Sequence, residues 1–291
     1  MKKRILAIAL ILMSLVMVVS NANVATTTTN KSVVASDAGK TSENNSKVTK
    51  VTCKEVSIVD EPDEMTRASS MRLPLDLKEI ITGEKSDKSY KFNTYVFSGK
   101  IISRKEFEFS WTDDQGEEWG PFPRAVLEVE ITKEYHGGSP VKGNIIRVLY
   151  PYSLSDLFDD SVRIKDNSEY VFANCWVLDD KYTDYVKKYA PEDKFESEKY
   201  ADVITGDSWN SLFPIDDGMV MAYHEFFDHD KEAKKQILPS DSISTDKLTS
   251  SDSLKSGYFT AMRKADFEEA FLRLFENPDK LPTIERDNES N

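Results

Sequence analysis

Segments in which apolar and polar residues alternate recur between residues 90 and 223, and they constrain the fold of this chain more than any other feature. Residues 107–111 (FEFSW) show the alternation, and residues 127–131 (LEVEI) show it again. Successive side chains of a β-strand point to opposite faces of the sheet, so a period of two predicts strands with one buried face. We therefore expect a mainly β fold.

Further apolar runs predict more strands and the kind of sheet that they form. Residues 95–103 are strongly apolar around Gly99, and glycine within a strand often marks a bulge or a bend at a barrel corner. Residues 145–150 and 219–223 are short apolar runs next to turn signals. Residues 170–178 are apolar almost throughout, which is typical of a strand covered on both faces. About five strands with a bend in the first predict a small five-stranded OB-like barrel.

Three other segments have helical spacing. Residues 75–81 predict a short helix, and tyrosines at helical spacing in residues 182–189 predict a helical insertion near residues 180–210. Asp266 and Glu269 form a capping-box pattern in front of an apolar stripe. We therefore expect a C-terminal helix after the barrel.

The flanks of the β-rich region differ from it in composition. The segment after the first 25 residues is rich in threonine, serine, asparagine and lysine, and it cannot bury enough apolar surface to offset the loss of chain entropy. The predicted organisation is a signal peptide at 1–25, a disordered tether at 26–50, an OB-like β-barrel domain at 51–227 with its helical insertion near 180–210, a polar linker at 228–256, a C-terminal strand and helix at 257–277, and a tail at 278–291.

The order of the segments resembles that of exported OB-like proteins of Gram-positive bacteria, which are similar in outline to netrin and tissue-inhibitor-of-metalloproteinase modules. The matching segments are the helix at 75–81, VFSGKIIS at 96–103, AVLEVEITKEYHGG at 125–138, GNIIRVLY at 143–150, EYVFANCWVL at 169–178 and the turn at 217–218. This resemblance covers residues 70–225 and implies a fold, but no activity. The inhibitors chelate zinc through an N-terminal cysteine, whereas Cys53 lies far inside this chain, so that role does not transfer.

The first 25 residues have the pattern of a secretory signal peptide. Lys2, Lys3 and Arg4 precede an apolar run of 15 residues at 5–19, and small residues follow it. A membrane span needs about 20 apolar residues, so this run is short for one. We expect a secreted, extracytoplasmic protein that touches the membrane only through this segment if the segment is not cleaved.

Net charge restricts the partners. The chain carries a formal net charge of −13, and cleavage of the basic leader makes it more negative. A negative field repels phosphate backbones, so we expect no nucleic-acid partner. A protein or a glycan outside the cell is the expected partner, and no cofactor is expected.

Three residues near position 225 are the candidate metal ligands: His224, Glu225 and His229. A zinc-protease helix places two histidines four positions apart so that both nitrogens reach one metal. Here the second histidine comes five positions after the first, which rotates it by about 100° on a helix. The alternative, which we favour, is a polar exit from a strand.

Two further features are candidate sites. Cys53 and Cys175 are the only cysteines, and in an oxidising compartment they predict a disulfide between the N-terminal segment and a core strand. The alternative is two separate thiols, with Cys175 buried as a small apolar residue. Trp119 follows an acidic turn that begins at Asp113, which we interpret as a solvated loop. An exposed tryptophan on a barrel rim stacks on sugar rings or anchors a partner, so Trp119 is the candidate ligand contact.

No complete catalytic set is recognisable in the chain. A G-x-S-x-G nucleophile elbow is absent, and the two S-x-x-K matches lack their companion motifs. We therefore predict a secreted, non-catalytic binding or interaction module for a protein or cell-envelope glycan, with catalytic residues unknown. Two alternatives stay open. The first is an extracellular hydrolase, either with or without a catalytic metal, and the second is an envelope-associated structural protein.

Overall fold

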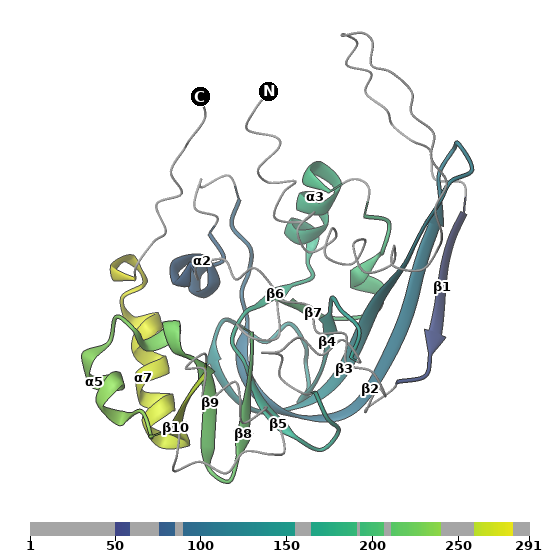
Figure 1. Cartoon of the computed structure of the whole chain (residues 1–291). Helices are drawn as coiled ribbons and strands as arrows, with labels where there is room; N and C mark the ends of the chain where they lie inside the picture. Colours follow the sequence, from purple (N-terminus) through teal and green to yellow (C-terminus); the bar gives the residue numbers. More distant parts are fainter. Residues whose placement is uncertain are drawn as a thin grey trace, which may run out of the picture.

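The computed structural model describes residues 50–58, 76–84, 90–154, 164–190, 193–206, 211–239 and 259–281, which form one curled, ten-stranded sheet with four α-helices (Figure 1). The mainly β fold is confirmed. The expected number of about five strands is wrong, because ten strands lie within these ranges. The expected signal peptide and all but the last residue of the tether lie outside the described residues.

Strands β2 (Val96–Thr112) and β3 (Glu118–His136) form a long antiparallel hairpin. The sequence predicted two strands where β2 is continuous. Its register shifts between Ser98 and Gly99, at the glycine where a bulge or bend was expected. Strand β1 (Lys50–Val56) pairs with the far half of β2. We call β1 and the halves of β2 and β3 next to their turn the ribbon, which extends as a curved arm in Figure 1.

The sheet continues from β3 and curls back towards the start of β2. β3 pairs with β4 (Ile145–Tyr150), and β4 pairs in parallel with β7 (Val203–Thr205). β7 pairs antiparallel with β6 (Cys175–Val177). The N–H of Tyr95, just before β2, then donates to the carbonyl of Cys175 at 3.0 Å. The hydrogen-bonded path that leaves β2 through β3 therefore returns to the chain at the start of β2.

The remaining strands extend the sheet from β5 (Glu169–Phe172), which pairs with β2. β8 (Leu212–Asp216) pairs with β5, β9 (Met219–Tyr223) with β8, and β10 (Phe259–Arg263) with β9. The single strand expected over residues 170–178 is thus divided into β5 and β6. The division falls where the pairing partner of this segment changes from β8 to β7, so the sequence, which is apolar except for Asn174, does not reveal it.

Two expected helices are present, and the start of a third differs from its prediction. α2 (Leu77–Thr82) buries its three apolar side chains, and α3 (Asp180–Tyr189) is the helical insertion. α7 (Lys264–Glu276) begins before the predicted capping box, with Arg263 at its N-cap and no capping side chain. The predicted cap at Asp266 is therefore wrong, and this residue lies in the first helical turn.

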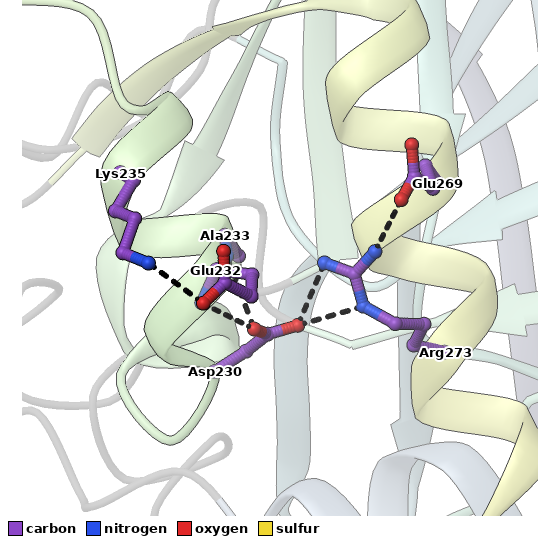
Figure 2. Close-up of polar contacts among 6 residues, drawn as sticks. All are labelled: Asp230, Glu232, Ala233, Lys235, Glu269 and Arg273. Carbon is purple, nitrogen blue, oxygen red and sulfur yellow. Dashed lines mark hydrogen bonds and ion pairs between the residues drawn. The ribbon is translucent and has the colours of Figure 1, made fainter.

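The polar segment 228–256 contains a short helix near its start, and this helix is attached to α7 by an ion pair. Asp230 caps α5 (Lys231–Gln236), and its carboxylate also pairs with Arg273 of α7, at 3.0 Å from Nε and 2.9 Å from Nη2 (Figure 2). The expectation of a linker is therefore wrong for this part of the segment, and residues 240–256 lie outside the described ranges.

Buried apolar side chains form two clusters. The main core lies between the curled sheet and the helices α2 and α7, and Phe97, Phe213 and Phe271 belong to it. The second cluster, which we call the ribbon core, consists of Phe109, Trp111, Phe122, Val126, Leu149, Phe195 and Ala201. Among the described residues, no helix combines the length and the apolar character needed to cross a membrane.

Candidate functional site

Trp119, the residue predicted to contact a ligand, is exposed in the structure. It lies near the start of β3, opposite Trp111 of β2, and the two indole rings are nearly parallel, with centroids 6.3 Å apart and planes at 9°. Trp111 is buried, whereas Trp119 keeps 46% of its surface exposed. The exposed ring therefore rests on a buried one.

Asp113 fixes the orientation of this exposed ring. Its Oδ2 accepts a hydrogen bond from Nε1 of Trp119 at 3.1 Å, and its Oδ1 accepts from the backbone N–H groups of Gln115 and Glu117, at 2.9 Å each. These hydrogen bonds, that of Trp119 first, lower the pKa of Asp113 below its ordinary value of 3.8 although burial opposes them. The interpretation of the turn as a solvated acidic loop is therefore wrong for Asp113, which organises the turn.

A row of three apolar side chains crosses the end of the ribbon. Val51 of β1 lies opposite Trp111, which in turn lies opposite Trp119, so the three occupy one face of the sheet. Val51 is 50% exposed. We call Val51, Trp111 and Trp119 the tip platform. The exposed carboxylates at its border belong to residues 114, 117 and 118.

The candidate metal ligands do not gather into a site. His224 and Glu225 lie on a 3₁₀ turn of four residues, and Glu225 accepts a hydrogen bond from the Tyr223 hydroxyl at 3.2 Å. Nε2 of His224 is 4.0 Å from a carboxylate oxygen of Asp228, and burial lowers the pKa of His229. Within the described ranges, no three histidine, cysteine or acidic side chains lie close enough together to hold a metal ion.

The two cysteines are also far apart. Cys53 is exposed on β1 opposite Phe109, and Cys175 is buried on β6 next to Tyr95; neither forms a disulfide. These two neighbours, Phe109 and Tyr95, are separated by most of the length of β2, so the two thiols lie at different parts of the sheet. The predicted bridge is therefore wrong in this structure, and the alternative of two separate thiols describes it.

A cavity of about 480 Å³ is a further feature that the sequence did not indicate. It lies where α2, the start of β2, the end of β3 and the end of α7 meet. Its lining includes Lys91, Phe92, His136 and Phe275. These residues come from segments far apart in the chain and share no motif, so only the tertiary fold brings them together.

Comparisons with known proteins give no relative from which a role can be transferred. No family model, no curated protein and no solved structure matches this chain. The geometry of its own residues is therefore the basis for any functional assignment.

Proposed function

We propose that this protein is a secreted, non-catalytic binding module that holds a protein or a cell-envelope glycan on its tip platform. The observation that carries the proposal is Trp119, which is half exposed and yet held by the ring of Trp111 and the carboxylate of Asp113. A rigid aromatic ring loses little conformational entropy on binding and offers a large contact area.

Two further features support parts of this proposal. The leader pattern at residues 1–25 supports secretion. The path of strands that leaves β2 and returns to it through β3, β4, β7 and β6 supports an OB-like barrel as the finer description of the fold. The two alternatives, an extracellular hydrolase and an envelope structural protein, have no comparable contact among the described residues to support them.

A comparison of matched variants on glycan and peptide arrays tests the proposal. We expect the purified protein to bind a ligand on one array, and Trp119→Ala to weaken this binding at least tenfold, as loss of an aromatic hot spot does. Ile145→Ala removes a side chain of similar exposure (50%) from β4 and serves as the control that keeps binding. Absence of any array ligand, or equal binding by Trp119→Ala, would overturn the proposal, provided that circular dichroism shows the variants to be folded.

A further inference from the structure

We propose that the cavity between α2 and the end of α7 binds a small molecule with a planar apolar body and one anionic group, such as an aromatic carboxylate. This site lies apart from the tip platform and does not depend on the function proposed for it. Its volume of about 480 Å³ is within the range of about 300–1,000 Å³ that small-molecule sites occupy.

The walls of the cavity are held together by close backbone contacts. Gly83, at the end of α2, accepts a hydrogen bond from the Phe92 N–H at 2.9 Å, and a Cβ on Gly83 would lie 2.4 Å from the Phe92 oxygen. At the other wall, a Cβ on Gly137 would lie 2.1 Å from the Thr94 oxygen. Both glycines have positive φ, 68° and 78°. Both walls therefore pack directly against the segment before β2, and the cavity is present in the structure without a ligand.

Aromatic rings make the lining suitable for a planar ligand. The ring of Phe92 stacks on Trp176, with centroids 4.5 Å apart and planes at 12°. His136 stacks on Phe275 in the same way, at 4.6 Å and 12°. Burial lowers the pKa of His136 below its ordinary value of 6.5, so its ring is neutral at pH 7 and adds no charge. Phe92 is buried, with 2% of its surface exposed, so the partly exposed pair of His136 and Phe275 supplies the flat, uncharged surface, which favours an aromatic body over a strongly hydrated one.

The charge of the lining selects an anion. Lys91 is the only charged residue among those that line the cavity, and none of them is acidic, although the chain has 51 acidic and 38 basic residues. Within the described part of the chain, no carboxylate pairs with the Lys91 ammonium group. Lys91 is exposed, and Glu84, which lies opposite it in an antiparallel bridge, makes no ion pair with it. The ammonium group can therefore form a charge-assisted hydrogen bond with a carboxylate on the ligand. The full lining is Ile81, Thr82, Lys91, Phe92, Asn93, Thr94, His136, Gly138, Pro140, Val177, Phe275 and Pro278.

Calorimetric titration with two probes of equal shape tests the site. The probes are 2-naphthoate, which is anionic, and 2-naphthamide, which is neutral. We expect the protein to bind naphthoate at least tenfold more tightly than naphthamide at pH 7. Lys91→Gln should remove most of this preference and leave the weaker binding of naphthamide unchanged, because the substitution removes the charge and no packed side chain.

A second pair of variants tests the location. An added Cβ at Gly138, on the cavity wall, meets no atom within 4 Å, and the same holds at Gly143 of the same loop, outside the lining. We expect Gly138→Trp to weaken both probes at least tenfold and Gly143→Trp to leave them unchanged. Trp119→Ala should also leave naphthoate binding intact, which separates this site from the tip platform. Absence of saturable naphthoate binding, or the same preference for naphthoate in Lys91→Gln, would overturn the proposal even if Gly138→Trp failed to fold.

Discussion

The carboxylate of Asp113 has two functions at the turn between β2 and β3. One oxygen binds two backbone N–H groups and so shapes the turn, and the other holds the indole N–H of Trp119. An ionised carboxylate accepts hydrogen bonds more strongly than a neutral one does. The orientation of the exposed ring is therefore coupled to the charge of a single residue.

This coupling predicts a pH dependence of the tip. The pKa of Asp113 is lowered below 3.8 in the folded protein, so the folded state favours the carboxylate. The ionised carboxylate therefore stabilises the folded state at pH values above the pKa that Asp113 has in the unfolded chain. This stabilisation is lost as the pH falls through the lower pKa that Asp113 has in the folded protein. We expect tryptophan fluorescence and urea stability of the wild type to change in the range below pH 3.8. Asp113→Asn, measured over the same range, should lack this component and should already have a less ordered Trp119 at pH 7. Identical pH profiles of the two proteins would contradict the assignment.

Sequence reasoning found Trp119 but missed Asp113. A tryptophan in a polar, acidic turn is conspicuous because apolar side chains normally avoid such places, so exposure of Trp119 was predictable. The hydrogen bond to Asp113 spans six residues and depends on how the turn folds back. Neither residue type nor spacing reveals such a bond, and the acidic cluster around it made a solvated loop the simpler interpretation.

Asp230 connects the helices α5 and α7, and, like Asp113, it uses its two carboxylate oxygens for different partners. Its Oδ1 accepts the N–H groups of Glu232 and Ala233 at the start of α5, and its Oδ2 faces the guanidinium of Arg273 on α7 (Figure 2). Burial favours the protonated form, but the Ala233 hydrogen bond and the charge of Arg273 outweigh it and lower the pKa of Asp230. Arg273 is held on its other side by Glu269, at 2.8 Å. A six-residue helix is marginal on its own, so α5 depends on tertiary contacts, of which this ion pair and the buried side chain of Ala233 are two.

Different substitutions of Asp230 separate the contribution of its helix cap from that of its ion pair. Asp230→Ala removes both the helix cap and the ion pair, and we expect it to lower the free energy of unfolding by about 1–2 kcal/mol. Asp230→Ser keeps a capping oxygen and should lose only the ion pair, which costs less than about 1 kcal/mol because both partners are partly exposed. Arg273→Met also removes the pair with Glu269 and should therefore cost at least as much as the serine variant. Urea unfolding at pH 7 measures all three, and an equal loss for alanine and serine would refute the capping role.

Sequence patterns located helices and strands well where the burial of side chains follows the local period of the sequence. They located strands poorly where pairing with distant segments determines that a strand forms. β4 agrees with its prediction, as do the buried face of α2 and the helix α3. β7 has only three residues and shows no alternation of its own, since its pairing with β4 and β6 defines it. β8 contains Pro214, a residue type that argues against a strand. Strands of this kind were not predictable from one sequence.

The two buried clusters divide the molecule into two parts, each with its own core. The main core joins the curled sheet to α2 and α7, whereas the ribbon core is smaller and lies under the extended arm. Phe195, which comes from the segment after α3, packs edge-on against Phe109 of β2 at 5.3 Å and stacks on Tyr200 at 4.9 Å. The ribbon therefore depends on side chains outside its own strands, and both clusters meet along β2 and β3. This division was not predictable, because both halves of β2 carry apolar side chains and only the tertiary fold decides which other segments pack on each half.

Since regions with few buried contacts open at lower free energy, we expect the ribbon to open without the rest of the molecule. Phe195→Ala should raise amide hydrogen exchange at least tenfold in β1 and in the ribbon halves of β2 and β3, and leave β8 and β9 unchanged. Phe213→Ala is the matched substitution in the main core, where Phe213 packs edge-on against Phe226 at 4.8 Å. It should accelerate exchange in β5, β8 and β9, and also in the ribbon, because a ribbon without its anchoring sheet has no independent support. If Phe195→Ala instead accelerated exchange in all ten strands equally, the two cores would unfold as one unit. The exposed tip would then owe its rigidity to the whole fold and not to the local contacts of Trp111 and Asp113.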